Sequence, residues 1–499
     1  MSNNENNNTQ DGLKHKATAG VFWITAQRFS QILVNFVSGI VLARLLSPED
    51  YGLIGMLSIF MLIAGTFIDG GFGFAIIQKK RPTQEDYSTV FFWNLGLAIV
   101  LYLILFVCAP AIASFYHVPL LSKVLRVSGI VLIINALRAI HENMLNKQFQ
   151  FRKLAITSVS SSLISLVLTI WLAYKGFGVW ALVAQNLILQ TIPMIVYWLT
   201  NNWVPKLMFS LKSFKELFSF GFYMLMNSLM ATIVNNIQGL LIGRLYNPAL
   251  MGYYSKAHST ETLASTTISQ AVTQVTFPLY SELQDQLGRL KAVIKKMTTT
   301  MAFVCFPMLF ILILVAKPLF VLLYSAKWLE SVPYFQLLCI SGLAASLASI
   351  NTQPIVAIGK SKLMFYWGVA KQGLGVILIV GGLFLYGIWG MLIGMVIKSW
   401  TVYFINAYLI AKYIGYKMKE QLRDLSSVFT ISLASFGIAY LCVLFLQCDM
   451  YLLAVVQISV FLFIYCGSMY LIKKELFRDT WDIIQPLLKK FKIKNNVIE

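Results

Sequence analysis

Apolar segments of about 20 residues recur along the whole chain, and this pattern constrains the fold more than any other feature. Each is long enough to cross the roughly 30 Å of hydrocarbon in a bilayer as a helix, in which every backbone polar group is satisfied. Of the 499 residues, 58% are hydrophobic and only 12% are charged, too few for a soluble protein of this length. The sequence therefore predicts an all-α polytopic membrane protein.

The apolar runs predict fourteen membrane spans, an even number that places both termini on one side. The predicted spans are residues 18–43, 51–77, 89–115, 119–140, 154–174, 178–200, 217–243, 251–278, 297–320, 332–358, 363–386, 388–411, 426–447 and 450–472.

Two stretches 200 residues apart carry the same motif. Residues 34–52 read VNFVSGIVLARLLSPEDYG, and residues 234–252 read VNNIQGLLIGRLYNPALMG. The shared positions include Asn35/Asn235, Gly39/Gly239, Arg44/Arg244, Pro48/Pro248 and Gly52/Gly252. Because the copies lie in the first and seventh spans, we expect two six-helix lobes in a pseudo-twofold repeat, followed by two C-terminal helices.

The repeat suggests a division of the chain into six parts. They are a disordered cytoplasmic tail (1–13), an N-lobe of spans one to six (14–200), an amphipathic interlobe linker (201–216), a C-lobe of spans seven to twelve (217–412), spans thirteen and fourteen (413–475) and a basic cytoplasmic tail (476–499). The first tail is polar and Asn-rich, as disordered segments are. Leu211, Phe214 and Phe218 share one helical face around the linker, which predicts a helix lying on the membrane surface.

The net charge of +20 invites a nucleic-acid partner, but its distribution argues against one. Alternate connectors hold 28 Lys and Arg against 5 in the opposite set. Positive connectors face the cytoplasm, so both termini are predicted to be cytoplasmic, and no nucleic acid is expected as a partner.

Seven further cations lie within the predicted spans. Lys123 and Arg138 lie near helix ends, where we expect them to snorkel to the interface. The deeper ones are Arg28, Arg126, Lys256, Lys371 and Lys398. A charge at depth costs at least about 2.5–3.5 kcal/mol, so each should face a wet cavity or a partner. Because the clear intramembrane acids are few, the interior is expected to be net cationic and to suit an anionic substrate.

Amide side chains accompany these cations in the predicted spans. The candidates are Asn35, Asn235, Gln238, Gln270 and Gln274. They could form interhelical hydrogen bonds or line a substrate cavity, and their stripes beside a cation favour the cavity. Asp69 and Glu261 could neutralise nearby cations or bind a coupling ion.

Motifs of metal or catalytic chemistry are missing from the sequence. The six cysteines and four histidines lack metal-ligand spacing, and no HExxH or GxSxG motif is present. We therefore expect no cofactor, no metal and no enzyme activity.

Several longer stretches resemble one family of membrane proteins. They are ARLLSPEDYGLIGMLSIF, DGGFGFAIIQKKRPTQEDYSTVFFWNLG, ENMLNKQFQFRKLA, FPLYSELQDQ and SAKWLESVPYFQLLCISGL. These stretches resemble the polysaccharide-transporter branch of the MOP flippase superfamily, of the colanic-acid, teichuronic-acid or O-antigen type. The similarity extends over nearly the whole chain.

The resemblance implies export of an undecaprenyl-diphosphate-linked oligosaccharide from the inner to the outer leaflet by alternating access. That role belongs to lipopolysaccharide or exopolysaccharide biosynthesis in a bacterial inner membrane, with membrane lipids and polysaccharide polymerase or export proteins as partners. It also implies that Arg28 contacts the diphosphate. The second-lobe position aligned with Arg28 is Ser228, so this cation is not duplicated.

Two other functions stay open. A cation-coupled multidrug exporter of the same superfamily would want acidic residues in its cavity, and this chain has few. A membrane glycan polymerase or acyltransferase would need large outer loops, and the predicted outer connectors are short.

Overall fold

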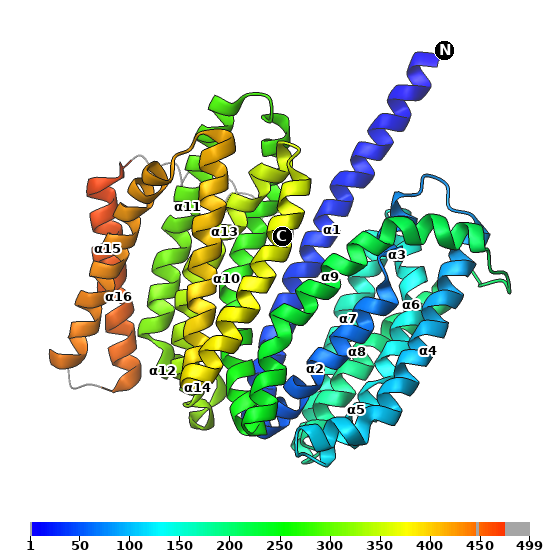
Figure 1. The fold of residues 1–499 in the computed structure, drawn as a ribbon, viewed down its shortest axis with the longest axis horizontal. Coiled ribbons are helices and arrows are strands. Elements are labelled where there is room, and N and C mark those ends of the chain that lie inside the picture. The colour runs from blue at the N-terminus through cyan, green and yellow to red at the C-terminus, as the bar shows by residue number, and fades with distance from the viewer. Residues whose placement is uncertain (1, 446–448, 475–499) are drawn as a thin grey trace, which may run out of the picture. The chain divides into compact units, whose positions relative to one another are not determined.

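The computed structural model describes residues 2–445 and 449–474, and every regular element in them is helical (Figure 1). The helices are α1 (Ser2–Leu45), α2 (Pro48–Asp69), α3 (Phe72–Gln78), α4 (Gln84–Phe115), α5 (Leu120–Ser128), α6 (Ile130–Lys147), α7 (Phe151–Tyr174), α8 (Val179–Thr200), α9 (Leu211–Leu245), α10 (Pro248–Glu282), α11 (Leu287–Leu314), α12 (Ala316–Tyr324), the 3-10 turn η1 (Ala326–Trp328), α13 (Ser331–Ala357), α14 (Ser361–Ile414), α15 (Met418–Phe445) and α16 (Met450–Ile472).

Twelve helical segments of the described chain are long and apolar enough to cross a membrane. One of them, α14, is broken at Tyr386 and Gly387, where Gly387 has a φ of 61°. The predicted eleventh and twelfth spans meet there. The predicted eighth span is α10, which is not among these twelve. The predicted all-α membrane fold is confirmed, while the count of fourteen stays a prediction.

The chain forms two compact units, Met1–Ser255 and Lys256–Glu499. In the first unit α1 packs on α7, α7 on α8, α4 on α6, and α2 on α9 (Figure 1). In the second unit α13 packs on α14 and α11, and α11 packs on α15, which also contacts α16. Helix α9, which the repeat assigns to the C-lobe, thus contributes to the first unit. The predicted lobe boundaries remain an interpretation of the repeat.

Two of the predicted segments, the N-terminal tail and the interlobe linker, differ from expectation. Helix α1 begins at Ser2 and includes the segment predicted as a disordered tail, since no proline interrupts the helix before Leu45. Part of the apolar face predicted to lie on the membrane surface is covered by protein, while Leu211 stays 67% exposed. Phe214 packs on Phe72 of α3 and on Trp93 of α4, with ring centroids 5.8 and 4.5 Å apart. These aromatic contacts attach the start of α9 to the first unit.

Polar contacts reinforce this attachment. Lys79, just after α3, contacts Asp86 of α4 at 3.0 Å and Glu216 of α9 at 3.1 Å. Asp86 also caps the start of α4, where it forms a capping box with Thr83. One buried carboxylate therefore starts a helix and anchors the connector between α3 and α4.

The two copies of the sequence repeat meet at their glycines. A Cβ on Gly52 of α2 would lie 1.8 Å from the carbonyl oxygen of Pro248, and one on Gly252 of α10 would lie 1.9 Å from that of Pro48. The contact is reciprocal, because each glycine follows its own helix-starting proline by one turn. Only glycine lets two backbones approach so closely. The shared motif therefore encodes a pseudo-twofold contact between the starts of α2 and α10.

We predict that Gly52→Ala and Gly252→Ala each destabilise the purified protein by about 1–3 kcal/mol, because the added methyl must displace a backbone carbonyl. Gly65→Ala is the matched control, since its Cβ would meet nothing within 4 Å on the same helix α2. Thermal unfolding in detergent measures the effect. Equal melting temperatures for Gly52→Ala and Gly65→Ala would contradict the contact.

Candidate functional site

A cavity of about 530 Å³ lies inside the first unit among α1, α6, α7 and α8. Its walls are mainly polar, which is unusual within a bundle of apolar helices. The polar residues that matter below are Gln27, Arg28, Gln31, Asn35, Arg138, Glu142, Asn146, Ser158 and Gln190. Amides and hydroxyls at membrane depth are stable only where water, a ligand or each other satisfy them.

Arg28 is the free cation of this cavity. Its side chain is exposed, and within the described residues it forms no hydrogen bond or ion pair. Asn35 lies two turns further along the same face of α1 and lines the same cavity. Gln31, between them, donates a hydrogen bond to Ser158 of α7. The predicted stripe of α1 therefore faces a polar cavity, and an unpaired guanidinium stands in it.

Arg138 does not snorkel to the interface as its position near a predicted helix end suggested. Its Nη1 donates to Oε1 of Gln190 at 2.6 Å, and its Nε lies 3.3 Å from Oε2 of Glu142. The prediction was wrong because α6 continues to Lys147, beyond the predicted end of the span at residue 140. The extra turns place Arg138 inside the unit and supply Glu142 as its partner.

Asp69 lies beside a different cavity, of about 320 Å³, among α2, α4 and α6. Arg126 of α5 lies in neither cavity. Its Nε donates to the carbonyl oxygen of Phe106 at 3.2 Å, and its guanidinium lies 4.4 Å from the centre of the Phe106 ring. Arg126 is thus held by α4, as a packing residue would be.

The predicted amides of the second repeat copy lie outside the described cavities. Asn235 of α9 is exposed, and Gln238 is 4% exposed with no partner for its Oε1 among the described residues. Gln270 of α10 is exposed. The side chain of Gln274 lies outside the part of the chain that the structure describes.

In the second unit, Lys256 is buried against aromatic rings. Its Nζ lies 4.0 Å from the centre of the Tyr324 ring and 5.7 Å from that of Trp328. A cation over aromatic faces is stabilised electrostatically even where it is desolvated. Glu261, five residues beyond Lys256 on α10, is 7% exposed and lies against Gly342, where a Cβ would be 2.5 Å from its Oε1.

Lys371 and Lys398 lie on the two halves of the broken helix α14. A Cβ on Gly375 would lie 3.2 Å from Nζ of Lys398, and Gly375 is one turn from Lys371. Both lysines are partly buried, and Nζ of Lys371 lies 5.8 Å from the centre of the Trp367 ring. The break in α14 thus brings two cations of separate spans to one region of the second unit.

Sequence reasoning missed the polar partners that surround Arg28 and Arg138. Glu142 and Gln190 were overlooked because a predicted helix end and a single amide carry little signal. The spacing of Arg138 and Glu142, four residues apart, was the available clue, since such residues are neighbours on a helix.

The arrangement of helices matches solved membrane transporters. The lipid II flippase MurJ in an inward closed conformation superimposes with a TM-score of 0.74 over 92% of this chain and 100% of its own, at 15% identity. An inward-facing multidrug resistance MATE family transporter of the MOP superfamily gives a TM-score of 0.60 over 77% of this chain and 94% of its own, at 18% identity. At such identities the likeness shows a shared fold.

The sequence comparisons identify the family. Residues 41–333 match the polysaccharide biosynthesis protein family, and the chain belongs to it. The teichuronic acid biosynthesis protein TuaB of Bacillus subtilis (strain 168) is 27% identical over 365 residues, covering 73% of this chain and 74% of TuaB. The lipopolysaccharide biosynthesis protein WzxC of Escherichia coli (strain K12) is 23% identical over 434 residues, covering 86% and 88%. The resemblance stated from the sequence is confirmed.

We predict that Arg138→Leu destabilises the protein by about 1–3 kcal/mol, because Glu142 and Gln190 both lose their partner. The double variant Arg138→Leu/Glu142→Leu should recover part of this loss, since no carboxylate is then stranded. Lys123→Leu, an exposed cation of the same unit, serves as the control. Thermal unfolding of the four proteins tests the pair, and a double variant that is no more stable than Arg138→Leu would contradict it.

Proposed function

We propose that this protein is a flippase that moves an undecaprenyl-diphosphate-linked oligosaccharide from the inner to the outer leaflet, for assembly of a cell-surface polysaccharide. The family, the relatives named for teichuronic acid and lipopolysaccharide biosynthesis, and the succinoglycan biosynthesis transport protein ExoT of Rhizobium meliloti (strain 1021), 24% identical over 71% of this chain and 72% of its own, support this. Alternating access of the MOP-type fold would carry the substrate across.

The observation that carries the proposal is the unpaired Arg28 in a cavity of amides and hydroxyls. A guanidinium presents a planar fork of donors that fits phosphate oxygens in pairs. Amide and hydroxyl groups around it, such as those of Gln27 and Asn35, can exchange hydrogen bonds with sugar hydroxyls. A volume of about 530 Å³ lies within the usual range of ligand pockets. The cavity is therefore suited to a diphosphate followed by a sugar.

The cations of the second unit would differ in role. Lys371 and Lys398, brought to one region by the break in α14, would attract a diphosphate or acidic sugars. Lys256 is held by Tyr324 and Trp328, which favours a packing role over substrate binding. Since Arg28 has no cationic counterpart at Ser228, the two repeats would contact different parts of the substrate.

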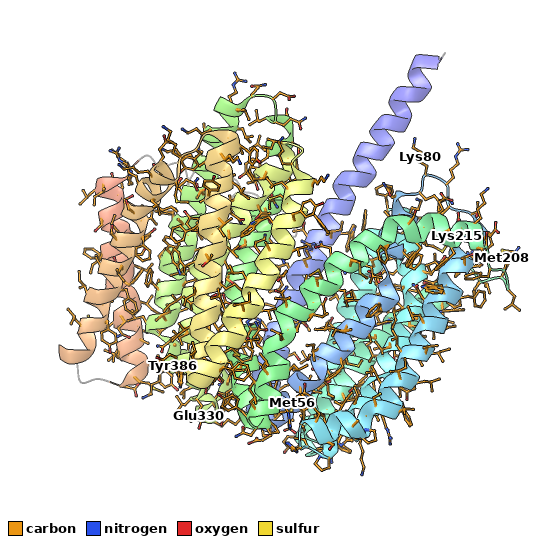
Figure 2. All side chains as sticks on the ribbon, viewed as in Figure 1. Met56, Lys80, Met208, Lys215, Glu330 and Tyr386 are labelled. Atoms are coloured by element: carbon orange, nitrogen blue, oxygen red, sulfur yellow. The ribbon has the colours of Figure 1, made fainter. Side chains whose placement is uncertain are left out.

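We further propose the inner membrane as the location, with both termini in the cytoplasm. The split of 28 to 5 cations between connectors supports this orientation. Within the first unit, Lys80 and Lys215 lie toward one end and Met56 toward the opposite end, as the alternation of spans requires (Figure 2). The glycine contact at Gly52 and Gly252 would then lie near the outer face.

Deletion of the gene tests the function. We expect undecaprenyl-linked oligosaccharide to accumulate in the inner leaflet and the surface polysaccharide to be lost. Mass spectrometry of extracted lipid intermediates and polysaccharide staining measure both. Unchanged lipid intermediates with altered drug tolerance would contradict the flippase and support a multidrug exporter.

Substitution of Arg28 tests the site. Loss of charge-assisted hydrogen bonds worth about 1.5–3 kcal/mol predicts that Arg28→Ala lowers polysaccharide export about tenfold or more at normal protein level. Arg28→Lys should keep part of the activity, since the charge remains and the paired fork is lost. Lys175→Ala, which removes an exposed connector cation, is the control. Export by Arg28→Ala equal to that of Lys175→Ala would show that the site assignment is wrong.

A further inference from the structure

The second cavity of the first unit lies where a membrane helix is interrupted. Helix α2 ends at Asp69, Gly70 and Gly71 adopt left-handed φ values of 52° and 73°, and α3 resumes at Phe72. The cavity of about 320 Å³ borders this break and is lined by α4 and α6. Its charged and amide-bearing lining residues are Asp69, Asn94, Asn135, Arg138, Glu142 and Asn143.

The break itself favours a cation. The last carbonyl groups of a helix lack intrahelical partners and carry partial negative charge. In transporters, the C-terminal ends of such discontinuous helices coordinate sodium ions or protons. Asp69 is the last residue of α2, so its carboxylate adds a full negative charge to that helix end.

Two amides that line this cavity, one buried and one partly buried, have side-chain oxygens without a partner among the described residues. Asn94 of α4 is only 3% exposed, and its Oδ1 has no hydrogen-bond partner among the described residues. The same holds for Oδ1 of Asn135 on α6, which lines the cavity from the next helix. Buried amide oxygens are almost always paired, so two such oxygens at one cavity leave acceptors open to a donor or a cation.

The charges of the cavity do not cancel among the described residues. Arg138 is engaged by Glu142 at 3.3 Å and by Gln190 at 2.6 Å. Asp69 has no ion-pair partner in the described part of the chain. Two carboxylates against one guanidinium leave one negative charge, which a monovalent cation would neutralise.

The side chains of Asp69 and Asn143 converge over Gly73. A Cβ on that glycine would lie 3.4 Å from Oδ1 of Asp69 and 3.2–3.4 Å from the amide atoms of Asn143. Glycine thus leaves the polar groups room to approach one another. Carboxylate and amide oxygens gathered in this way are ligands of hard cations.

We propose that Asp69, Asn94, Asn135 and Asn143 bind a sodium ion at the α2–α3 break, with Glu142 and Arg138 as a flanking ion pair. The role of this sodium ion as the coupling ion of transport rests on the proposed function. Its binding to the protein does not depend on that function. The break packs on α9, because a Cβ on Gly221 would lie 2.6 Å from the carbonyl oxygen of Gly70. Occupancy of the site would therefore bear directly on the position of α9.

Sodium binding to the purified full-length protein tests the proposal. In nanodiscs at constant ionic strength, with N-methylglucamine replaced by sodium, we expect the melting temperature to rise and saturate. Isothermal titration calorimetry with sodium chloride should give a saturable isotherm. The isosteric Asp69→Asn and the variant Asn94→Leu should weaken sodium binding about tenfold or more. Glu85→Gln, an exposed acid at the start of α4, should bind sodium as the wild type does.

Three outcomes would overturn the sodium site. They are a wild type without a saturable sodium response, an Asp69→Asn variant that keeps the wild-type affinity, and a response to pH with none to sodium, which would indicate a proton instead. Circular dichroism and size-exclusion chromatography verify that each variant is folded. The sodium assay contains no glycan, so a negative result would not contradict the proposed flippase function. In the same way, a negative result of the deletion experiment would not contradict the proposed sodium site.

Discussion

The close contact between the two repeat copies is the constraint on which the first unit depends. Gly52 and Gly252 admit the carbonyl groups of Pro48 and Pro248 to positions that any side chain would occupy. In lipid, helices gain little from burying apolar groups against one another, so close packing of small residues supplies much of their association. The proline one turn earlier starts each helix, and in α2 the capping box of Ser47 and Asp50 secures that start. The repeated motif therefore specifies both the start of each helix, at its proline, and the close crossing of α2 and α10, at its glycine.

Polar groups then divide the first unit into two chemical environments. One cavity displays Arg28, an unpaired cation, and the other displays Asp69, an unpaired anion, while Arg138 and Glu142 line both. An ion pair between two cavities separates opposite charges within one bundle of helices. In a transporter, the first environment suits an anionic substrate and the second suits a cation, and both lie on helices that the sequence repeat positions.

The sequence predicted the class of fold well because membrane insertion leaves few choices. Apolar runs of about 20 residues must be helices in lipid, and the repeat at Asn35 and Asn235 predicted duplication. It also predicted that Arg28 and Asn35 share a face, since helical spacing alone decides that. It failed for Arg138 because the predicted end of the fourth span, at residue 140, lies several residues before the end of α6. An error of that size moves a side chain from the interface to the inside of the helix bundle. It failed for Phe214, which packs on protein, because an amphipathic helix can lie on lipid or on protein equally well.

By itself, the sequence determined the helices, their repeat, the family and the cations that must avoid lipid. Each of these follows from local composition, spacing or similarity. Only the tertiary structure decided which polar groups find partners. It paired Arg138 with Glu142 and Gln190, placed Lys256 over Tyr324, and left Arg28 and Asp69 unpaired among the described residues. The reason is physical: whether a buried charge is satisfied depends on distances between side chains of different helices, and no spacing along one helix specifies those distances.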